Sequence, residues 1–378
     1  MKNRAIRSAA FTVVLACCLG TANAYDYSIS DIGYLSGYGQ SVGAAVNASG
    51  QVAGYSFGYS GYDGLLAQSF LWQNGAMTDL GTLPSFSRQN YSTALNNSGQ
   101  VVGYSNLPVN NNAFFWQESG MSNLAPSATT GYLYPNSINS TAQVAGWIYG
   151  GNNGAYNNAF LWQNGNLQLL LPGIDSRAIG INDSGQVVGY SSTVTGGHGF
   201  IWQNGNLTDL GDLPGGIDSS MATGINARGE VVGSSGTSTG WHGFIWQSGT
   251  MTDLGDLPGG DDYSNALAIN AGGSVVGYSE SSTGKHAFLW QSGSLTDLNS
   301  TASLAPGWML TEAVSINDKG QILANGTDGN YQRAFLLTPM APVPEPQTWA
   351  MLIAGFVTVS ATRRRNRTPM QPEINLGA

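Results

Sequence analysis

The stretch HAFLWQSGSLTDL, residues 286–298, decides the fold because near-copies of it recur along the chain. The copies read HGFIWQSGTMTDL at 242–254, HGFIWQNGNLTDL at 198–210 and NAFLWQNGNLQLL at 158–170. In each copy an apolar run is followed by an Asn-Gly or Ser-Gly step and then by a second short run. Asn-Gly steps are typical of type I′ turns, whose two central residues need a positive φ. The stretch therefore predicts a tight β-hairpin.

The hairpin belongs to a longer unit that begins upstream of it. Each unit starts with a short run that ends in an asparagine, passes through a turn such as NDSG, and continues with a second run such as QVVGYS. Asn can bond the backbone ahead of it, and Gly supplies the positive φ that closes such a turn. The anchoring asparagines are Asn47, Asn96, Asn139, Asn182, Asn226, Asn270 and Asn317, at spacings of 49, 43, 43, 44, 44 and 47 residues.

The hydrophobic pattern within the units indicates the architecture. The runs QVVG and AFLW are apolar at consecutive positions, whereas a half-buried strand alternates. Such runs need burial on both faces, which four-stranded sheets stacked face to face provide. A repeat of about 40–50 residues with four strands matches one blade of a propeller. The sequence predicts an all-β chain that forms a seven-bladed β-propeller with four strands per blade.

The two ends of the repeat region predict how the ring closes. The seventh unit stops after its third run, AFLLTPM. Residues 31–35, DIGYL, align with residues 209–213, DLGDL, where an earlier unit ends its fourth run. We therefore expect residues 25–35 to supply the fourth strand of the last blade, so that no sheet edge stays open.

The repeated segments resemble a known family. HAFLW and NAFLW, with INxxGxVVG about ten residues upstream, are similar to the extracellular HAF repeat. The resemblance covers all seven units and so most of residues 25–341. It implies an exported repeat protein, and it carries no catalytic residues over to this chain.

Residues 1–24 predict a secretory signal peptide. A basic start precedes the apolar run AAFTVVLACCLG, and Ala22 and Ala24 form an A-x-A cleavage site. The alternative is a lipoprotein signal at Cys17 or Cys18, although the preceding VLA fits a lipobox poorly. Both cysteines lie within this segment, so the sequence after it has none for a disulfide.

Residues 342–367 predict a second targeting signal. An apolar segment at 349–362 lies between a short motif and a basic cluster, and it is shorter than the ~17–25 residues of a stable membrane span. The basic cluster would stay on the cytoplasmic side of a membrane. The motif and the cluster consist of Pro344, Glu345 and Pro346, and of Arg363, Arg364 and Arg365.

This ordered set resembles the PEP-CTERM sorting signal of Gram-negative bacteria. The resemblance implies export, transient inner-membrane anchoring through 349–362, and cleavage near the Pro-Glu-Pro motif by an exosortase-type enzyme. Such proteins are associated with exopolysaccharide and biofilm matrix. The polar tail at 368–378 departs from the family pattern, and an ordinary C-terminal anchor is the alternative.

The charge balance excludes several kinds of partner. Seven of the 13 Lys and Arg residues lie in the two terminal segments, so residues 25–341 keep 6 basic and 20 acidic side chains, a net charge of −14. This charge argues against nucleic acid and anionic membrane surfaces. Divalent cations and neutral glycans remain compatible with it.

The three histidines of the chain, His198, His242 and His286, occupy one position of consecutive units. Three imidazoles can hold zinc, but equivalent positions of adjacent blades are well separated away from the axis. We align the same position with Ser69, Asn112, Asn158 and Arg333 in the other units. We therefore interpret it as a polar strand-edge position and predict no metal there.

The tryptophans fall into two groups. One group ends the third strand of its unit and is interpreted as core between blades. The other group, Trp147, Trp241 and Trp308, lies outside that column, as do the loop residues Tyr55, Tyr59 and Tyr62, and forms a candidate recognition surface. The core group consists of Trp72, Trp116, Trp162, Trp202, Trp246 and Trp290.

The loops GDLPGGIDSS and GDLPGGDDYS carry clustered aspartates. Oxygen ligands in Gly-rich loops suit Ca²⁺, but their spacing matches neither an EF-hand nor a nonapeptide calcium repeat. The sequence predicts no cofactor, with Ca²⁺ as the alternative left open. The loop aspartates are Asp212, Asp218, Asp256, Asp261 and Asp262. A separate set at the end of the fourth strands, Asp79, Asp209, Asp253 and Asp297, is expected to bond backbone in a turn.

No catalytic constellation stands out from the repeat. There is no H-E-x-x-H motif, Glu is scarce, and units four to six are nearly identical, whereas catalytic sites are asymmetric. The sequence predicts an exported, non-enzymatic, surface or biofilm-matrix-associated binding or structural protein. The alternative is a secreted carbohydrate-active enzyme on a propeller, with carboxylates from different blades.

Overall fold

The computed structural model describes residues 27–60, 64–83, 89–106, 112–124, 131–150, 156–192 and 196–340. Within these residues no helix has the length and apolar character that a membrane crossing requires. Several predicted features lie outside the described residues. They are the signal peptide with Ala22 and Ala24, Tyr62, the sorting motif at 344–346, the apolar segment at 349–362, the arginines at 363–365 and the tail at 368–378.

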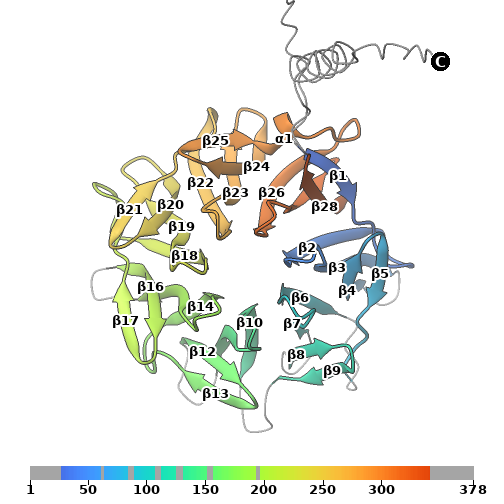
Figure 1. Ribbon diagram of the computed structural model, residues 1–378, viewed down its shortest axis with the longest axis horizontal. Helices are drawn as coiled ribbons and strands as arrows, with labels where there is room; N and C mark the ends of the chain where they lie inside the picture. Colours follow the sequence, from blue (N-terminus) through green and yellow to red (C-terminus); the bar gives the residue numbers. More distant parts are fainter. Residues whose placement is uncertain are drawn as a thin grey trace, which may run out of the picture.

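The chain is all-β, and its strands form four-stranded antiparallel sheets arranged around a common axis (Figure 1). The first strand of each unit lies nearest the axis in Figure 1 and the fourth lies outermost. The first strands are β2 (Gln40–Val46), β6 (Asn90–Leu95), β10 (Tyr132–Ile138), β14 (Ser176–Ile181), β18 (Ser220–Ile225), β22 (Gly259–Ile269) and β26 (Met309–Ile316). The second strands are β3 (Val52–Ser60), β7 (Val101–Ser105), β11 (Val144–Tyr149), β15 (Val187–Ser192), β19 (Val231–Gly236), β23 (Val275–Ser281) and β27 (Ile322–Thr327).

In every sheet except the one that contains β28, the outer half is the hairpin that the repeated stretch predicts. The third strands are β4 (Gly64–Gln73), β8 (Asn112–Gln117), β12 (Asn157–Gln163), β16 (Gly197–Gln203), β20 (Trp241–Gln247), β24 (Gly284–Gln291) and β28 (Gln332–Pro339). The fourth strands are β5 (Ala76–Asp79), β9 (Gly120–Asn123), β13 (Asn166–Leu169), β17 (Asn206–Asp209), β21 (Thr250–Asp253) and β25 (Ser294–Asp297), and a short helix α1 (Leu298–Thr301) follows β25. The turn at Ser292 and Gly293 has φ of 52° and 84°, as a type I′ turn requires.

The N-terminal strand β1 (Tyr27–Asp31) completes the sheet that contains the end of the repeat region. It pairs antiparallel with β28, so this sheet has the order β1-β28-β27-β26. The predicted alignment holds in detail, because Ile32 donates a backbone hydrogen bond to Ala334 as Leu210 does to Gly199. Segments about 300 residues apart in sequence thus lie side by side (Figure 1).

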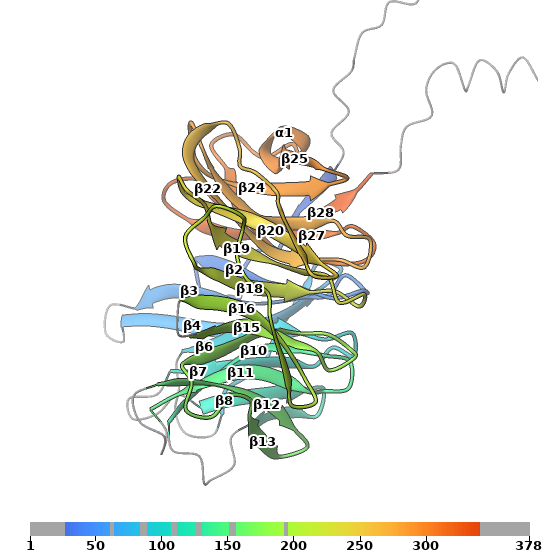
Figure 2. The same ribbon diagram turned by 90° about the vertical axis from the view of Figure 1, so that its left-hand side faces the viewer.

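The core lies between neighbouring sheets, which are seen edge-on in Figure 2. Val101 and Val102 are both fully buried, yet Val101 packs with the sheet before it and Val102 with the sheet after it. This burial on both faces is why the strand is apolar at consecutive positions. A phenylalanine two positions before the core tryptophan is also fully buried in successive sheets, at Phe70, Phe114, Phe160, Phe200, Phe244 and Phe288.

The glycine of the second strand is required by packing. A side chain at Gly103 would place its Cβ 2.1 Å from the carbonyl oxygen of Tyr91 and 2.5 Å from the ring of Phe114. Real Cβ atoms do not approach backbone so closely, so the first strand can cross the second at this point only above a glycine. The same close approach recurs at Gly54, Gly146, Gly189, Gly233 and Gly277.

The anchoring asparagines form a closed ring of hydrogen bonds at one end of the axis. The side-chain amide of Asn182 donates to the backbone carbonyl of Asn226, and its carbonyl oxygen accepts from the backbone N–H groups of Ser184 and Gln186. Each asparagine donates in this way to the next, and Asn317 donates back to Asn47. All seven are buried, so the repeated Asn satisfies its own turn and joins neighbouring units at once.

Candidate functional site

The opposite end of the axis carries a ring of side chains that differ from unit to unit. Each unit contributes one residue of its first strand and the residue that pairs with it on the second strand. This pair lies next to the close-packed glycine, on the side away from the asparagine. We call this set the channel mouth. Its pairs are Val42 with Tyr55, Tyr91 with Tyr104, Tyr134 with Trp147, Arg177 with Tyr190, Met221 with Ser234, Asn265 with Tyr278, and Glu312 with Asn325.

Five aromatic side chains of the channel mouth form a continuous arc across three sheets. Tyr55 meets Tyr91 edge-on with ring centroids 4.9 Å apart, and Tyr91 stacks on Tyr104 at 5.2 Å. Tyr104 meets Tyr134 edge-on at 5.3 Å, and Tyr134 stacks on Trp147 at 4.2 Å. Offset-stacked and edge-to-face contacts of this kind stabilise one another, so the arc is a preorganised wall of half-buried rings.

Arg177 extends the arc into the next sheet. Its guanidinium carbon lies 4.8 Å from the ring centroid of Trp147, a cation–π contact. The side chain is exposed, and no carboxylate among the described residues forms an ion pair with it. Its planar array of N–H donors is therefore available to a ligand.

A cavity of about 690 Å³ lies along the axis below the channel mouth. Its wall is built mainly from the first strands, and Trp147 and Arg177 belong both to this wall and to the arc. The wall combines apolar residues such as Leu267 and Val314 with polar residues such as Asn136 and Thr223 in about equal measure. Among the described residues that line it there is no Asp or Glu.

The other side of the channel mouth holds a compensated pair of charges. The Lys285 ammonium lies 2.6 Å from a carboxylate oxygen of Glu312 and 3.8 Å from the ring centroid of Tyr278. Tyr278 in turn stacks on Tyr263 with centroids 6.0 Å apart. A smaller cavity of about 310 Å³ is lined by Lys285 and Glu312. The one unpaired charge of the channel mouth is thus that of Arg177 within the described residues.

The hydroxyls of Tyr55, Tyr91 and Tyr104 in the channel mouth keep their protons at physiological pH, because their pKa values are raised. Burial, with smaller contributions from Tyr104, Tyr91 and Glu312, raises the pKa of Tyr55 to about 12. Burial also raises the pKa of Tyr91, and burial with the neighbouring tyrosines raises that of Tyr104. These groups therefore act as neutral hydrogen-bond donors and acceptors.

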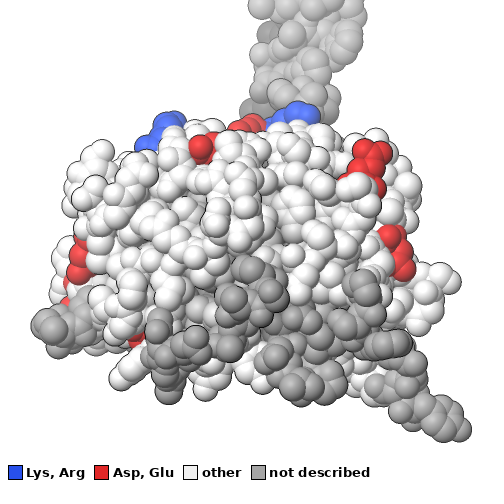
Figure 3. Space-filling model, turned by 90° about the horizontal axis from the view of Figure 1, so that it is seen from below, with Lys and Arg blue, Asp and Glu red and all other residues white. Residues whose placement is uncertain are grey.

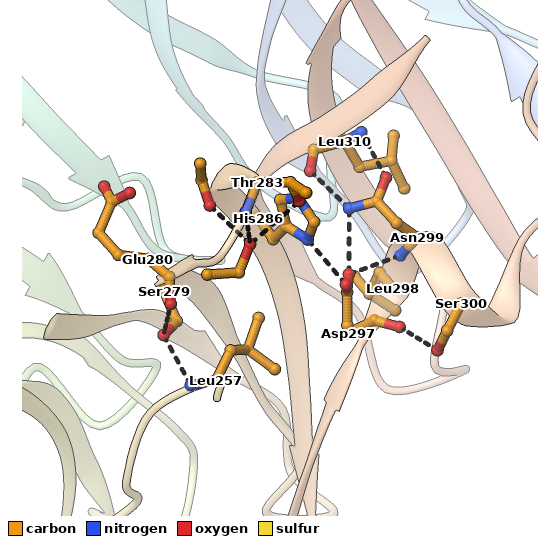
Figure 4. Close-up of polar contacts among 12 residues, drawn as sticks. Leu257, Ser279, Glu280, Thr283, His286, Asp297, Leu298, Asn299, Ser300 and Leu310 are labelled. Atoms are coloured by element: carbon orange, nitrogen blue, oxygen red, sulfur yellow. Dashed lines mark hydrogen bonds and ion pairs between the residues drawn. The ribbon is translucent and has the colours of Figure 1, made fainter. Parts of the chain in front are cut away.

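The histidine column is a set of buried links. His286 is 8% exposed, and its Nδ1 lies 2.7 Å from Asp297 and its Nε2 2.8 Å from the Thr283 hydroxyl (Figure 4). His198 is equally buried and bonds Asp209 and Asp218 at 3.0 and 2.7 Å. The polar position therefore has a structural role, because each imidazole ties strand three to the turn that ends strand four.

The strand register also corrects the alignment of that column. Phe70 occupies the place of Phe288, so the residue equivalent to His286 is Gln68 and not Ser69. Gln68 bonds Asp79 at 2.6 Å, as the histidines bond their own aspartates.

The aspartates at the ends of the fourth strands behave as predicted. Asp79, Asp209 and Asp253 each accept a hydrogen bond from the backbone N–H two residues ahead, at 2.7–2.8 Å. Asp297 accepts the same bond from Asn299 and caps α1, and Asp31 of the N-terminal strand accepts it from Gly33.

Two of these links also involve the loop aspartates that the sequence singled out. His242 bonds Asp253 and Asp262, both at 2.8 Å. Burial lowers the pKa of His242, but the hydrogen bonds and charges of these two carboxylates outweigh it and raise the pKa above 6.5. The pKa of His198 is raised by the same balance. Asp261 is exposed, lies outside the cluster and takes no part in the link.

The three tryptophans of the predicted recognition surface lie in different surroundings. Trp147 is part of the channel mouth. Trp241 lies at the point where β20 pairs in parallel with Tyr263 of the next sheet. Trp308 packs edge-on against Phe335 with centroids 5.4 Å apart, so the structure does not gather the three into one surface.

The other aromatic residues singled out from the sequence also lie in different surroundings. Tyr55 belongs to the channel mouth, whereas Tyr59 is 80% exposed away from the arc. The tryptophans predicted as core are buried or pack against buried clusters between sheets, at Trp72, Trp116, Trp162, Trp202, Trp246 and Trp290. Sequence reasoning missed Arg177 and the tyrosines of β6, β7 and β10. Tyr104 directly follows the repeated glycine of the second strand, whereas Arg177, Tyr91 and Tyr134 lie on first strands and pair with the residue at that position.

The spacing G-x-S-x-G of serine hydrolases occurs twice, at 54–58 and 236–240, and sequence reasoning passed over both. The motif needs a turn from a strand into a helix that exposes the serine. Ser56 is instead buried within β3, where it accepts a hydrogen bond from Leu35. Ser238 lies between two strands, β19 and β20. Neither serine has a histidine partner among the described residues.

The rim of the molecule carries few charges. On the side shown in Figure 3, acidic and basic atoms are sparse against an uncharged surface.

Comparison with known proteins adds information on the fold. No family model matches the chain, and no curated protein matches it. A puromycin-hydrolyzing peptidase of Mycobacterium tuberculosis matches with TM-score 0.53 and 11% identity over 83% of this chain and 56% of its own. YCF48 bound to D1 peptide matches with TM-score 0.50 and 10% identity over 84% and 96%.

A third match has a lower TM-score. It is the beta-propeller domain of the Trilobed protease from Pyrococcus furiosus, with TM-score 0.39 and 10% identity over 70% of this chain and 96% of that domain. The chain spans little more than half of the peptidase it matches. At these identities the likeness shows the fold alone: the chain is an all-β protein of four-stranded sheets with β-propeller neighbours.

Proposed function

We propose that this protein is an exported seven-bladed β-propeller that binds a neutral polysaccharide of the cell surface or biofilm matrix at its channel mouth. The observation that carries the proposal is the aromatic arc from Tyr55 to Trp147, which ends on Arg177 at a cavity of about 690 Å³. A cavity of that size is in the usual range for small-molecule and oligosaccharide sites.

The asparagines at one end of the axis support a count of seven blades. The hydrogen bonds of that ring pass through seven asparagines and return to the first. In a propeller each of these would mark one blade, and β1 would complete the last blade from the N-terminal side.

The chemistry of the channel mouth fits sugar hydroxyls. The neutral tyrosine hydroxyls can donate and accept, and the Arg177 fork can donate two parallel hydrogen bonds to neighbouring hydroxyls of one sugar ring. The net charge of −14 over residues 25–341 opposes a polyanionic chain at long range. We therefore assign the ligand to the neutral class.

The assignment is tested by calorimetric titration of the full chain with neutral glucose hexasaccharides of both anomeric linkages. An acidic galacturonic acid hexasaccharide serves as the comparison ligand. We expect binding of a neutral chain and about tenfold weaker binding after Trp147→Ala, since loss of the ring removes about 1.4 kcal/mol at that ratio. If only the acidic hexasaccharide bound, the assignment of the ligand to the neutral class would be wrong.

A matched variant distinguishes loss of the binding site from a general loss of stability. Trp241→Ala removes a half-buried tryptophan elsewhere in the molecule, and we expect it to leave the affinity unchanged. Equal losses in the two variants would show that the channel mouth is not the binding site.

The surface location rests on the two terminal signals of the sequence. We propose cleavage after Ala24, transient anchoring through 349–362 and removal of the C-terminal segment near Glu345 by an exosortase-type enzyme. Mass spectrometry of the protein from its native cell surface should then find an N-terminus at Tyr25 and a C-terminus near residue 346. An intact arginine cluster in the surface protein would contradict this processing.

A secreted carbohydrate-active enzyme is the alternative that the sequence left open. Glycoside cleavage commonly uses two carboxyl groups flanking the bond. The described wall of the cavity has none, and Glu312 beside it is paired with Lys285. This arrangement supports a binding role in preference to cleavage.

A further inference from the structure

Two of the three histidine links have two more carboxylates near the imidazole than the third. His198 lies with Asp212 and Asp218, and His242 lies with Asp256 and Asp262. In each set, one ligand atom from every residue lies within 4.8 Å of the others. The offsets from histidine to the two aspartates, 14 and 20 residues, are the same in both sets.

The imidazole of each set is held as a metal ligand usually is. His242 Nδ1 lies 2.8 Å from Asp253, and this contact fixes the orientation of the ring. The Nε2 atom then points toward Asp262. Histidines that bind metals commonly use one nitrogen for the ion and the other for such an orienting carboxylate. His198 has the same arrangement with Asp209 on Nδ1 and Asp218 on Nε2.

In the His242 set, two carboxylates retain acceptor capacity that the described residues do not fill. Oδ2 of Asp262 is shielded from water and has no hydrogen-bond partner of good geometry, although the nearby Thr239 hydroxyl and His242 lower the pKa of this carboxyl. Asp256 is half-buried, and no hydrogen bond to its side chain is found among the described residues. A shielded anionic oxygen without a donor is a costly arrangement that a cation would relieve.

We propose that each set binds one Zn²⁺ ion through the Nε2 atom of its histidine and one oxygen of each loop aspartate. The donor set of one imidazole and two carboxylates suits Zn²⁺, which takes nitrogen and oxygen ligands at about 2.0–2.2 Å. Ca²⁺ prefers six to eight oxygen ligands, so the histidine changes the preference that the loops alone suggested. Binding displaces the proton that the imidazole otherwise shares with the nearest carboxylate.

Each ion would join two consecutive sheets. His198 comes from β16, Asp212 follows β17, and Asp218 precedes β18 of the next sheet. The two sheets already touch there through a parallel bridge between Gly197 and Ser219. Zn²⁺ would therefore stabilise the folded chain by mass action as its concentration exceeds the Kd.

The third histidine provides a control within the chain. His286 is oriented by Asp297 in the same way, but its Nε2 faces Thr283. The residues 14 and 20 positions ahead are Ser300 and Pro306, which offer no carboxylate. This junction has the orienting part of the site without its acidic ligands.

The test is equilibrium dialysis of the full chain against Zn²⁺ after removal of metals with a chelator, with bound metal measured by mass spectrometry. We expect about two more Zn²⁺ ions per chain than in the D212N/D256N double variant, and one more than in each single variant. We also expect Zn²⁺ to raise the melting temperature of the unsubstituted chain and not that of the double variant. These substitutions leave the histidine hydrogen bonds in place, so the fold should persist.

Control variants and a second metal complete the experiment. His286→Gln should retain both ions, and Ca²⁺ at equal concentration should not occupy the sites. Equal Zn²⁺ uptake by the chain and the double variant would overturn the proposal, because cysteines 17 and 18 are present in both. Equal uptake of Ca²⁺, or loss of an ion in His286→Gln, would overturn it as well.

Discussion

The two ends of strand β14 show how the same element serves repetition and variation. Asn182 follows its C-terminal end, is 5% exposed and repeats in every unit of the ring. Arg177 lies near its N-terminal end, is exposed and has no basic counterpart at that register in the other units. Only four residues separate them in sequence.

The difference shows that the fold constrains the residue at one end of each first strand and does not constrain the residue at the other end. Every first strand must end in a turn that joins the next unit, and one side chain, asparagine, fills all of the required hydrogen bonds. Beyond the close-packed glycine no such requirement acts, so tyrosine, tryptophan, arginine, methionine and glutamate all occur there. Side chains at the varied end can therefore be chosen for a ligand.

The largest effect should follow from removing β1, which completes the four-stranded sheet at the end of the repeat region. A chain that begins at Ser36 lacks β1, which pairs with β28 and brings buried Ile32 into the core. Its removal exposes an unpaired strand and apolar surface. We expect loss of the single cooperative transition in calorimetric melting, together with aggregation. A truncated chain that melts like the full chain would show that β1 does not close the structure.

The next largest effect should come from the repeated end. Asn182→Ala removes four side-chain hydrogen bonds and leaves backbone groups of the turn unpaired. We expect a loss of about 3–4 kcal/mol in the free energy of unfolding, measured by chemical denaturation. Asn97→Ala is the matched control, because Asn97 is exposed, bonds one backbone N–H at 2.9 Å and can be replaced by water. A loss equal to that of the control would mean that the ring is not structural.

The structure at the repeated end of the first strands could be predicted from the sequence, whereas the contacts at the varied end could not. The asparagine spacing, the double-sided strands and the Asn-Gly turns all recur, so each copy reinforces the interpretation of the others. The contacts among Tyr91, Tyr104 and Tyr134 arise only when strands from two neighbouring units converge on one axis, and no single segment indicates them. The second partner of His198 could not be predicted for the same reason, since Asp218 approaches it from the following sheet.

A smaller effect should depend on pH at the histidine links. The folded-state pKa values of His198 and His242 are raised above the unfolded value of 6.5. This contribution to stability is fully present below about pH 6.5 and is lost as the pH rises through the folded-state values. The facing carboxylates are partly exposed, so we expect less than about 1 kcal/mol per link.

The measurement is chemical denaturation between pH 5.5 and 8.5 with a chelator present to exclude metals. The unsubstituted chain should lose stability across this range, and the His198→Gln/His242→Gln variant should lose less. Identical pH profiles would show that these imidazoles do not bind protons more tightly in the folded chain.

The smallest effect on stability should come from the varied end of β14. Arg177→Gln removes one exposed cation–π contact, which contributes about 0.5–1 kcal/mol at most in an exposed setting. We therefore expect an unfolding free energy within about 1 kcal/mol of the unsubstituted chain, against several for Asn182→Ala. Oligosaccharide affinity should fall severalfold in the same variant, because the guanidinium fork of the channel mouth is lost. Arg228→Gln, which removes an exposed arginine paired with Glu230, should leave that affinity unchanged. A variant of Arg177 that keeps full affinity and loses stability would reverse the roles assigned to the two ends.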